Sequence, residues 1–89
     1  MDFEWDPAKA RANESKHEVS FFEACEVFDD AHSSAVRDPD HSLEENRYLI
    51  FGMSKGGKYL VVSYTEPGDR IRMISARQMT PRERKAYEQ

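Results

Sequence analysis

The chain has 89 residues, a net charge of −4 and one cysteine. A chain of this length is expected to form a single domain over residues 1–89, and it buries only about 60 to 65 % of its unfolded surface. Because Cys25 has no partner for an internal disulfide, the sequence does not fit a disulfide-stabilised secreted scaffold. The N-terminus does not resemble a signal peptide, and no run approaches the roughly 20 apolar residues that span a bilayer. We therefore expect a cytoplasmic protein without a membrane partner.

The charges are unevenly distributed along the chain. Residues 1–46 hold 13 acidic and 4 basic side chains, whereas residues 47–89 hold 4 acidic and 9 basic ones. Because affinity for phosphates follows the number of cations that meet them, the second half is a candidate surface for a polyanion. The alternative is that salt bridges to the acidic half use up these charges, and composition leaves both interpretations open.

Two helices are predicted in the first third of the chain. Residues 3–5 are a candidate edge strand, and Asp6-Pro7 then begins a helix over residues 7–16, since aspartate is a good N-cap and proline fits the first helical position. Ser20 and Glu23 have the spacing of a capping box. Apolar side chains follow at helical spacing, namely Phe21, Ala24, Cys25 and Phe28.

The rest of the chain predicts strands and a closing helix. Alternation of period two indicates strands over residues 34–37, 47–53 and 70–76, with turns at Gly56-Gly57 and Pro67-Gly68. Residues 58–65 are apolar on both faces and are predicted to be a central strand. A second capping box, Thr80-Pro81-Arg82-Glu83, begins a helix that extends to about Tyr87. The predicted fold class is α+β: a small antiparallel meander of three or four strands, two N-terminal helices and one C-terminal helix, with the helices on one face of the sheet.

Several classes of enzyme are disfavoured by the sequence. His17, His32 and His41 have no cysteine or histidine partner at ligand spacing, so no metal site is predicted. The glycine pair at 56–57 lies in a hairpin and not before a helix, and no nucleophile elbow is present. No cofactor is expected.

Arginines on the predicted strands are the remaining candidates for chemistry. Arg47 begins one strand and Arg77 stands at the end of the last. In a meander of extended strands these positions lie at opposite ends of the sheet, unless a bulge or bend follows Met73. Period two also places Arg72 and Arg77 on opposite faces. The simplest interpretation of each arginine is a solvent-exposed or salt-bridged sheet residue.

A series of short motifs resembles one protein family. The motifs are Phe3-x-Trp5-Asp6-x-x-Lys9, Asn13-x-x-Lys16-His17-x-Val19-Ser20-Phe21, Ala24-x-x-Val27-Phe28-x-Asp30, Asp40-His41-Ser42-x-Glu44, Arg47, Gly52, Val61-Val62 and Arg72-x-Ile74-Ser75-Ala76-Arg77, followed by Glu83 and Tyr87. Each is weak alone, but their joint order over nearly the whole chain resembles the BrnT toxins.

This resemblance implies a RelE-like fold, a ribonuclease activity and a BrnA-type antitoxin as partner. The antitoxin is expected to bind DNA, so that this chain is associated with promoter DNA only through the antitoxin. The implied reaction needs no metal. The 2′-hydroxyl of the RNA substrate attacks the adjacent phosphorus while a base removes its proton, cations hold the phosphorane oxygens, and an acid protonates the leaving 5′-oxygen.

The resemblance also implies which residues act. Arg47 and Arg77 match the functional arginines of the family and are predicted to hold the reacting phosphate, because a guanidinium makes bidentate charge-assisted bonds. Glu45 or His17 is the candidate base, the latter because a free imidazole exchanges protons near neutral pH. Glu45 would alternatively orient Arg47, and His17 would alternatively be a turn residue that caps the first helix.

Three further cations are candidate RNA-binding residues. Arg72 is expected to assist the other arginines, and Lys9 and Lys16 to contact the RNA backbone. The two lysines would otherwise merely solvate a helix. A rival hypothesis is a non-catalytic module that pairs with a DNA-binding partner and co-represses a promoter, which the acidic first half favours because it complements a basic partner. A plain structural subunit is a third hypothesis.

Overall fold

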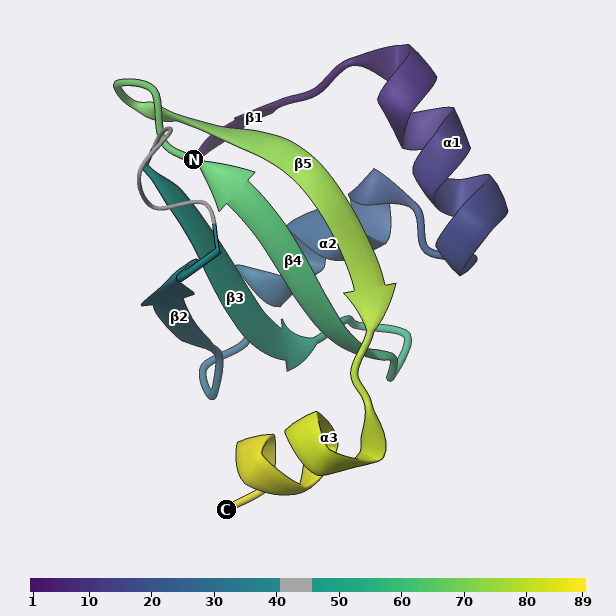
Figure 1. Ribbon diagram of the computed structural model, residues 1–89, viewed down its shortest axis with the longest axis vertical. Helices are drawn as coiled ribbons and strands as arrows, with labels where there is room; N and C mark the ends of the chain where they lie inside the picture. Colours follow the sequence, from purple (N-terminus) through teal and green to yellow (C-terminus); the bar gives the residue numbers. More distant parts are fainter. Residues whose placement is uncertain (41–45) are drawn as a thin grey trace.

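A five-stranded sheet forms the centre of the molecule in this computed structural model, which describes residues 1–40 and 46–89. The strand order is β1-β5-β4-β3-β2 (Figure 1). The strands are β1 (Asp2–Glu4), β2 (Ser34–Arg37), β3 (Arg47–Met53), β4 (Tyr59–Thr65) and β5 (Arg70–Gln78). Strands β2 to β5 form the predicted antiparallel meander, and β1 adds a parallel edge strand next to β5. The α+β fold class is thus confirmed, with one parallel pairing that the sequence did not predict.

The three helices begin at the predicted caps. In α1 (Pro7–His17) the Asp6 carboxylate accepts the Ala8 N–H at 2.8 Å, and proline occupies the first turn. In α2 (Phe21–Val27) and α3 (Pro81–Tyr87) both reciprocal bonds of a capping box are present. These bonds satisfy backbone donors that a helix leaves free at its N-terminus, which explains why the helices begin at these residues.

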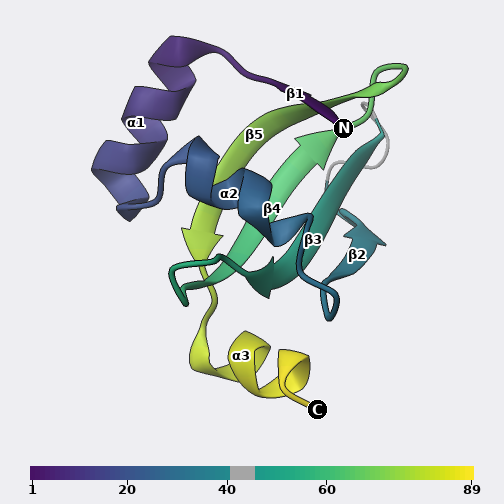
Figure 2. The same ribbon diagram turned by 180° about the vertical axis from the view of Figure 1, so that it is seen from behind.

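The core lies between α1, α2 and one face of the sheet (Figure 2). Its buried apolar residues are Val19, Phe21, Ala24, Val27, Ile50, Leu60, Val62, Tyr64, Ile71, Met73 and Ala76. The helix α3 does not join this layer and lies at the end of the sheet where β3 and β5 end (Figures 1 and 2). The expectation that all helices pack on one face is therefore wrong for α3. The physical reason is that α3 has no buried residue and so no apolar stripe to bury.

Buried hydrogen bonds from Asn13 attach α1 to β5. The side-chain amide donates to the carbonyl oxygens of Val19 at 3.0 Å and Ala76 at 2.9 Å, and its oxygen accepts the Ala76 N–H at 3.0 Å. Strand β1 pairs with only three residues of β5, and Ala76 lies beyond them. At Ala76 the Asn13 side chain makes the hydrogen bonds that a neighbouring strand would otherwise make. This packing fixes α1 against the edge of the sheet.

The second face of the sheet, turned away from α1 and α2, is called the open face here. Pairing of Arg47 with Thr65, and of Thr65 with Arg72, places these residues in one row across β3, β4 and β5. Phe51, Val61 and Arg77 form a second row on the same face. All three arginines that the sequence singled out thus lie on the open face.

A β-bulge in β5 produces this common facing. Ser75 pairs with Ser63 and Met73 pairs with Tyr64, so the residue between them, Ile74, has no partner on β4. The extra residue shifts the alternation, and Met73 and Ala76 both belong to the core. Arg72 and Arg77 consequently share the open face. The prediction for a regular strand, that they lie on opposite faces, is wrong because of this bulge.

Within the described ranges, no helix combines the length and the apolar character that crossing a bilayer requires.

Candidate functional site

Arg47 and Arg72 lie at one end of the open face. They belong to the same row, on β3 and β5, and β4 lies between these two strands. Their Cα atoms are therefore about 10 Å apart. Arg72 is paired with Glu4 of β1, whose Oε2 lies 2.7 Å from its Nε, and the other oxygen of Glu4 lies 3.3 Å from Nε of Arg70. For Arg72 the salt-bridge interpretation is confirmed, and the partner comes from the acidic half of the chain.

Arg77 lies near the other end of the face, where β5 leads into α3. Its NH1 and NH2 donate to the two carboxylate oxygens of Glu83 at 2.8 and 2.9 Å, and NH1 also donates to the Gln78 carbonyl at 3.2 Å. A guanidinium has five N–H donors, so the Nε–H and one N–H of NH2 are left without a partner among the described residues. The pair therefore fixes the plane of the guanidinium and leaves one edge available.

The ion pair changes the titration of both groups. Hydrogen bonds from Arg77, and then the Thr80 backbone N–H, lower the pKa of Glu83 to about 2 against the effect of burial. The hydrogen bond with Glu83 raises the pKa of Arg77 above its ordinary value. Glu83 is therefore ionised at neutral pH and is a very weak base, which suits it to orienting Arg77 and not to accepting a proton from a substrate.

Arg47 and Arg77 are not brought together. Their rows are four residues apart along the strands and two strands apart across the sheet, which corresponds to about 16 Å between Cα atoms. This is the separation that the strand directions of a meander imply. The bulge brings Arg72 onto the face of Arg77, but it does not place Arg47 beside Arg77.

The remaining predicted site residues lie elsewhere or outside the described ranges. Glu45, with the His41-Ser42-x-Glu44 motif, lies outside the residues that the structure describes. His17 is the half-buried last residue of α1, before the left-handed C-cap Glu18. Among the described residues, no hydrogen bond or ion pair joins His17 to an arginine of the open face. Lys9 and Lys16 are exposed on α1.

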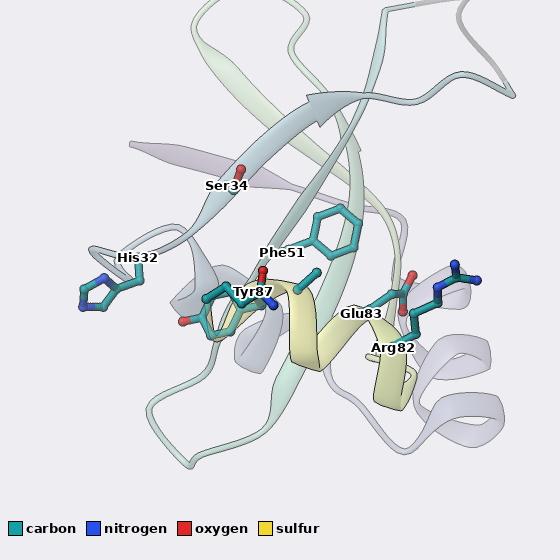
Figure 3. A pocket seen from close by; sticks show the side chains of 8 residues that line it. His32, Ser34, Phe51, Arg82, Glu83 and Tyr87 are labelled. Carbon is teal, nitrogen blue, oxygen red and sulfur yellow. The ribbon is translucent and has the colours of Figure 1, made fainter.

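A groove between α3 and the sheet adjoins Arg77, and is called the α3 groove (Figure 3). It has a volume of about 530 Å³. Its lining residues are His32, Ser34, Phe51, Arg82, Glu83, Ala86, Tyr87 and Gln89. Sequence reasoning missed His32, Phe51 and Arg82 as site residues. One signal for Phe51 was available, because in period two it shares a face with Arg47 and not with the core.

Tyr87 holds the C-terminal end of α3 against the loop after α2. Its hydroxyl donates to the Asp30 carboxylate, which also accepts the backbone N–H groups of Met53 at 2.8 Å and His32 at 3.0 Å. Burial raises the pKa of Tyr87 to about 12, with the hydrogen bond to Asp30 acting in the same direction. For Asp30, burial alone would raise the pKa, but the hydrogen bonds from Tyr87 and the two N–H groups outweigh it and lower the pKa.

The chemistry available to this arrangement is charge stabilisation by guanidinium groups. Burial, then the carboxylates of Glu26 and Asp29, raises the pKa of the Cys25 thiol to about 11, so it stays protonated and is a poor nucleophile at neutral pH.

Over residues 1–40 and 46–89, no cluster of three histidine, cysteine, aspartate or glutamate side chains is placed to hold a metal ion.

The fold is similar to that of a solved structure. The 1.1 Å crystal structure of the Brucella abortus ribonuclease toxin BrnT superposes with a TM-score of 0.71, covering 90% of this chain and 97% of that chain at 19% sequence identity. At this identity the likeness establishes the α+β architecture, a sheet with two N-terminal helices on one face and a closing helix at its end.

The family follows from the sequence match. Residues 5–83 match the family described as "Ribonuclease toxin, BrnT, of type II toxin-antitoxin system". No curated protein sequence gives a match. This chain therefore belongs to the BrnT family of ribonuclease toxins of type II toxin–antitoxin systems. The resemblance inferred from the motifs is confirmed, and membership implies an RNA substrate and an antitoxin partner.

Proposed function

We propose that this chain cleaves RNA on the open face of the sheet without a metal ion, and that a BrnA-type antitoxin neutralises it. The observation that carries this proposal is the β-bulge at Ile74, which places Arg72 and Arg77 on the same face as Arg47. Guanidinium groups on a face that neither α1 nor α2 covers suit a phosphate backbone, because each makes charge-assisted, often bidentate bonds and stays protonated. The groups that neutralise phosphates also supply most of the affinity for a nucleic acid.

Different arginines serve different parts of the RNA in this proposal. Arg77 contacts the scissile phosphate, since Glu83 holds its guanidinium in a fixed plane with two N–H donors available. Arg47 and Arg72 hold a neighbouring stretch of backbone at the other end of the face, because about 16 Å separates Arg47 from Arg77. Preorganised donors of this kind stabilise charge that develops in a transition state.

The reaction proceeds by internal transesterification. The 2′-hydroxyl loses its proton to a base and its oxygen attacks the adjacent phosphorus, the bond from phosphorus to the 5′-oxygen breaks, and an acid protonates that oxygen. The products are a 2′,3′-cyclic phosphate and a 5′-hydroxyl. Glu45 and His17 stay the candidates for the base, and alanine substitution of each in turn decides between them. Lys9 and Lys16 stay candidate backbone contacts, but because α1 packs on the other face of the sheet, they would contact only RNA that extends beyond the open face.

The test uses purified protein and unstructured RNA in the presence of EDTA. We expect cleavage with 2′,3′-cyclic phosphate ends, detected by mass spectrometry. Arg77→Ala is expected to lower kcat/KM by about 10²–10³-fold, the typical effect of losing one transition-state donor. Arg47→Ala and Arg72→Ala are expected to act mainly on KM. Arg11→Ala, an exposed arginine of α1, is the matched control and is expected to leave cleavage unchanged.

Two results contradict the proposal. One is cleavage that stops in EDTA and returns with Mg²⁺, which would assign the chemistry to a metal ion. The other is unchanged cleavage by Arg77→Ala with an unchanged circular dichroism spectrum. Either outcome removes the open face as a metal-independent site.

A non-catalytic function is favoured by one other observation. Phe22 on α2 is 74% exposed and lies four residues before Glu26, which places the two on one side of the helix, and Asp29 follows in the turn after it. An exposed aromatic ring beside carboxylates suits a basic protein partner. If purified protein does not cleave RNA but represses promoter DNA together with its antitoxin, this second function replaces the first.

A further inference from the structure

We infer that the α3 groove binds one unpaired nucleobase of the RNA strand, stacked on Phe51, next to the phosphate that Arg77 contacts. This inference rests on the proposed function and deepens it, because it assigns the feature that selects where the RNA is cut. Figure 3 shows the Phe51 ring directed into the groove, with the side chains of Glu83 and Arg82 on α3 beside it.

Phe51 lies outside the core cluster of the protein. Its ring is half-buried, and the core cluster lies on the opposite face of the sheet. A large aromatic side chain on an open sheet face is a stacking platform for bases, because every base presents a π-face. The neighbouring position on β2 is Ser34, whose small side chain leaves the ring accessible from that side.

The distance to Arg77 matches the size of a nucleotide. Phe51, Val61 and Arg77 form one row, so about 10 Å separates the Cα atoms of Phe51 and Arg77. At this spacing the phosphate of a nucleotide can contact Arg77 while its base reaches Phe51. Glu83 belongs to both features, since it orients Arg77 and lines the groove.

The charge of this surface favours RNA over the antitoxin as the occupant. Arg47, Arg72 and Arg77 share the face, and Arg82 lines the groove itself. Because Glu4 pairs with Arg72 and Glu83 pairs with Arg77, the groups that attract a phosphate at this end of the face are Arg82 and the remaining N–H donors of Arg77, and they oppose the basic partner that the acidic first half of the chain suits. His32, Ser34 and Arg82 also line the groove, and their polar groups can supply donors and acceptors for the edge of a base.

The experiment combines a protein change with an RNA change. The cleavage site of the wild-type protein is mapped on an unstructured RNA, and short RNAs are then made in which each nucleotide near that bond is abasic in turn. Binding is measured by fluorescence anisotropy and cleavage by gel electrophoresis. The variants are Phe51→Leu, which keeps an apolar side chain but removes the ring, and Phe22→Leu, a matched control on the helical side of the molecule.

One abasic position is expected to weaken binding to the wild-type protein by about 5- to 150-fold, the usual range for loss of one stacked base. The same penalty is expected to disappear in Phe51→Leu and to persist in Phe22→Leu. The preference for one cleavage position is expected to broaden in Phe51→Leu only.

The possible failures are distinguishable. If the wild-type protein cleaves RNA and the abasic penalty is equal in Phe51→Leu, this inference is wrong and the proposed function stands. If the protein binds RNA with a Phe51-dependent penalty but never cleaves it, the inference stands and the proposed reaction is wrong. Loss of antitoxin binding by Phe51→Leu with unchanged RNA binding would make the groove an antitoxin site. A protein that neither binds nor cleaves RNA excludes both proposals.

Discussion

Arg77 on β5 and Glu83 in the first turn of α3 are joined by two parallel hydrogen bonds of 2.8 and 2.9 Å. The same Glu83 carboxylate accepts the Thr80 N–H at 2.9 Å and so caps α3. One side chain therefore begins the helix and fixes the guanidinium. Because of this shared contact, the placement of α3 and the orientation of Arg77 cannot change independently.

Replacing the carboxylate separates these two roles. Glu83→Gln keeps an amide oxygen for the cap but removes the charge, and we expect it to lower the free energy of unfolding at pH 7 by about 1 kcal/mol, since Arg77 is partly exposed to solvent. The pKa of Glu83 is lowered from 4.5 to about 2, so its contribution is present above pH 4.5 and is lost as the pH falls toward 2. Urea unfolding at pH 7 and pH 2 should show the two proteins converging in acid. A difference that stays constant with pH would contradict this assignment.

Tyr87 is expected to control the attachment of α3. Its pKa is raised from 10.0 to about 12, so the stability that it contributes is present below pH 10 and is lost as the pH rises through 12. Tyr87→Phe should therefore speed amide hydrogen exchange in α3 at neutral pH, while exchange in β4 stays slow. Asp30→Asn should lower the pH at which Tyr87 ionises, measured by tyrosinate absorbance. Unaltered exchange in α3 of Tyr87→Phe would show that other contacts hold the helix.

Gly52 is required by close packing and not by its backbone conformation. A Cβ atom at this position would lie 2.7 Å from Cγ1 of Val27 and 3.1 Å from Oδ2 of Asp30. Because Val27 is fully buried, it has little room to move, and Gly52→Ala is expected to cost about 1 to 3 kcal/mol of stability. At Gly56 the added atom would meet only Oγ of Ser54 at 3.9 Å, and Gly56→Ala serves as the control with a change within about 0.5 kcal/mol. Chemical unfolding measures both, and equal effects would argue against a packing constraint at Gly52.

Asn13 is expected to be among the most sensitive polar positions. It is 7% exposed and makes three hydrogen bonds, two of them with the backbone of Ala76. Asn13→Ala leaves these backbone groups buried without partners, which should cost about 2 to 4 kcal/mol. Asn13→Asp should be at least as damaging, because a carboxylate has no N–H for the two carbonyl oxygens. A loss below 0.5 kcal/mol, roughly that of an ordinary surface change, would mean that water replaces the amide.

Several elements were predictable because their causes are local. The capping residues Asp6, Ser20 and Thr80 each bond to a backbone N–H two or three residues away, so their sequence pattern is sufficient to place the helix starts. The strands of the meander follow from period two and from the turns between them. The family was also predictable, since the spacing of short motifs along the chain is a property of the sequence itself.

The candidate site was less predictable because it depends on contacts between distant segments. The pairing of β1 with β5 joins residues about 68 positions apart, and the short length of β1 gives it little pattern of its own. The α3 groove combines the loop before β2 with β3 and α3, so no window of sequence contains it. The partner of Arg77 was hidden because Glu83 already had a sufficient explanation as a capping residue.

Sequence alone determined the order of the elements, the starts of the helices and the family, because each depends on hydrogen bonds and apolar spacing within a few residues. Only the tertiary structure decided which side chains share a face and which lie side by side. The facing of Arg77 depends on the single unpaired residue Ile74, and its neighbours depend on where α3 returns to the sheet. A one-residue shift in pairing reverses the facing of every later side chain in a strand, and local pattern does not encode it.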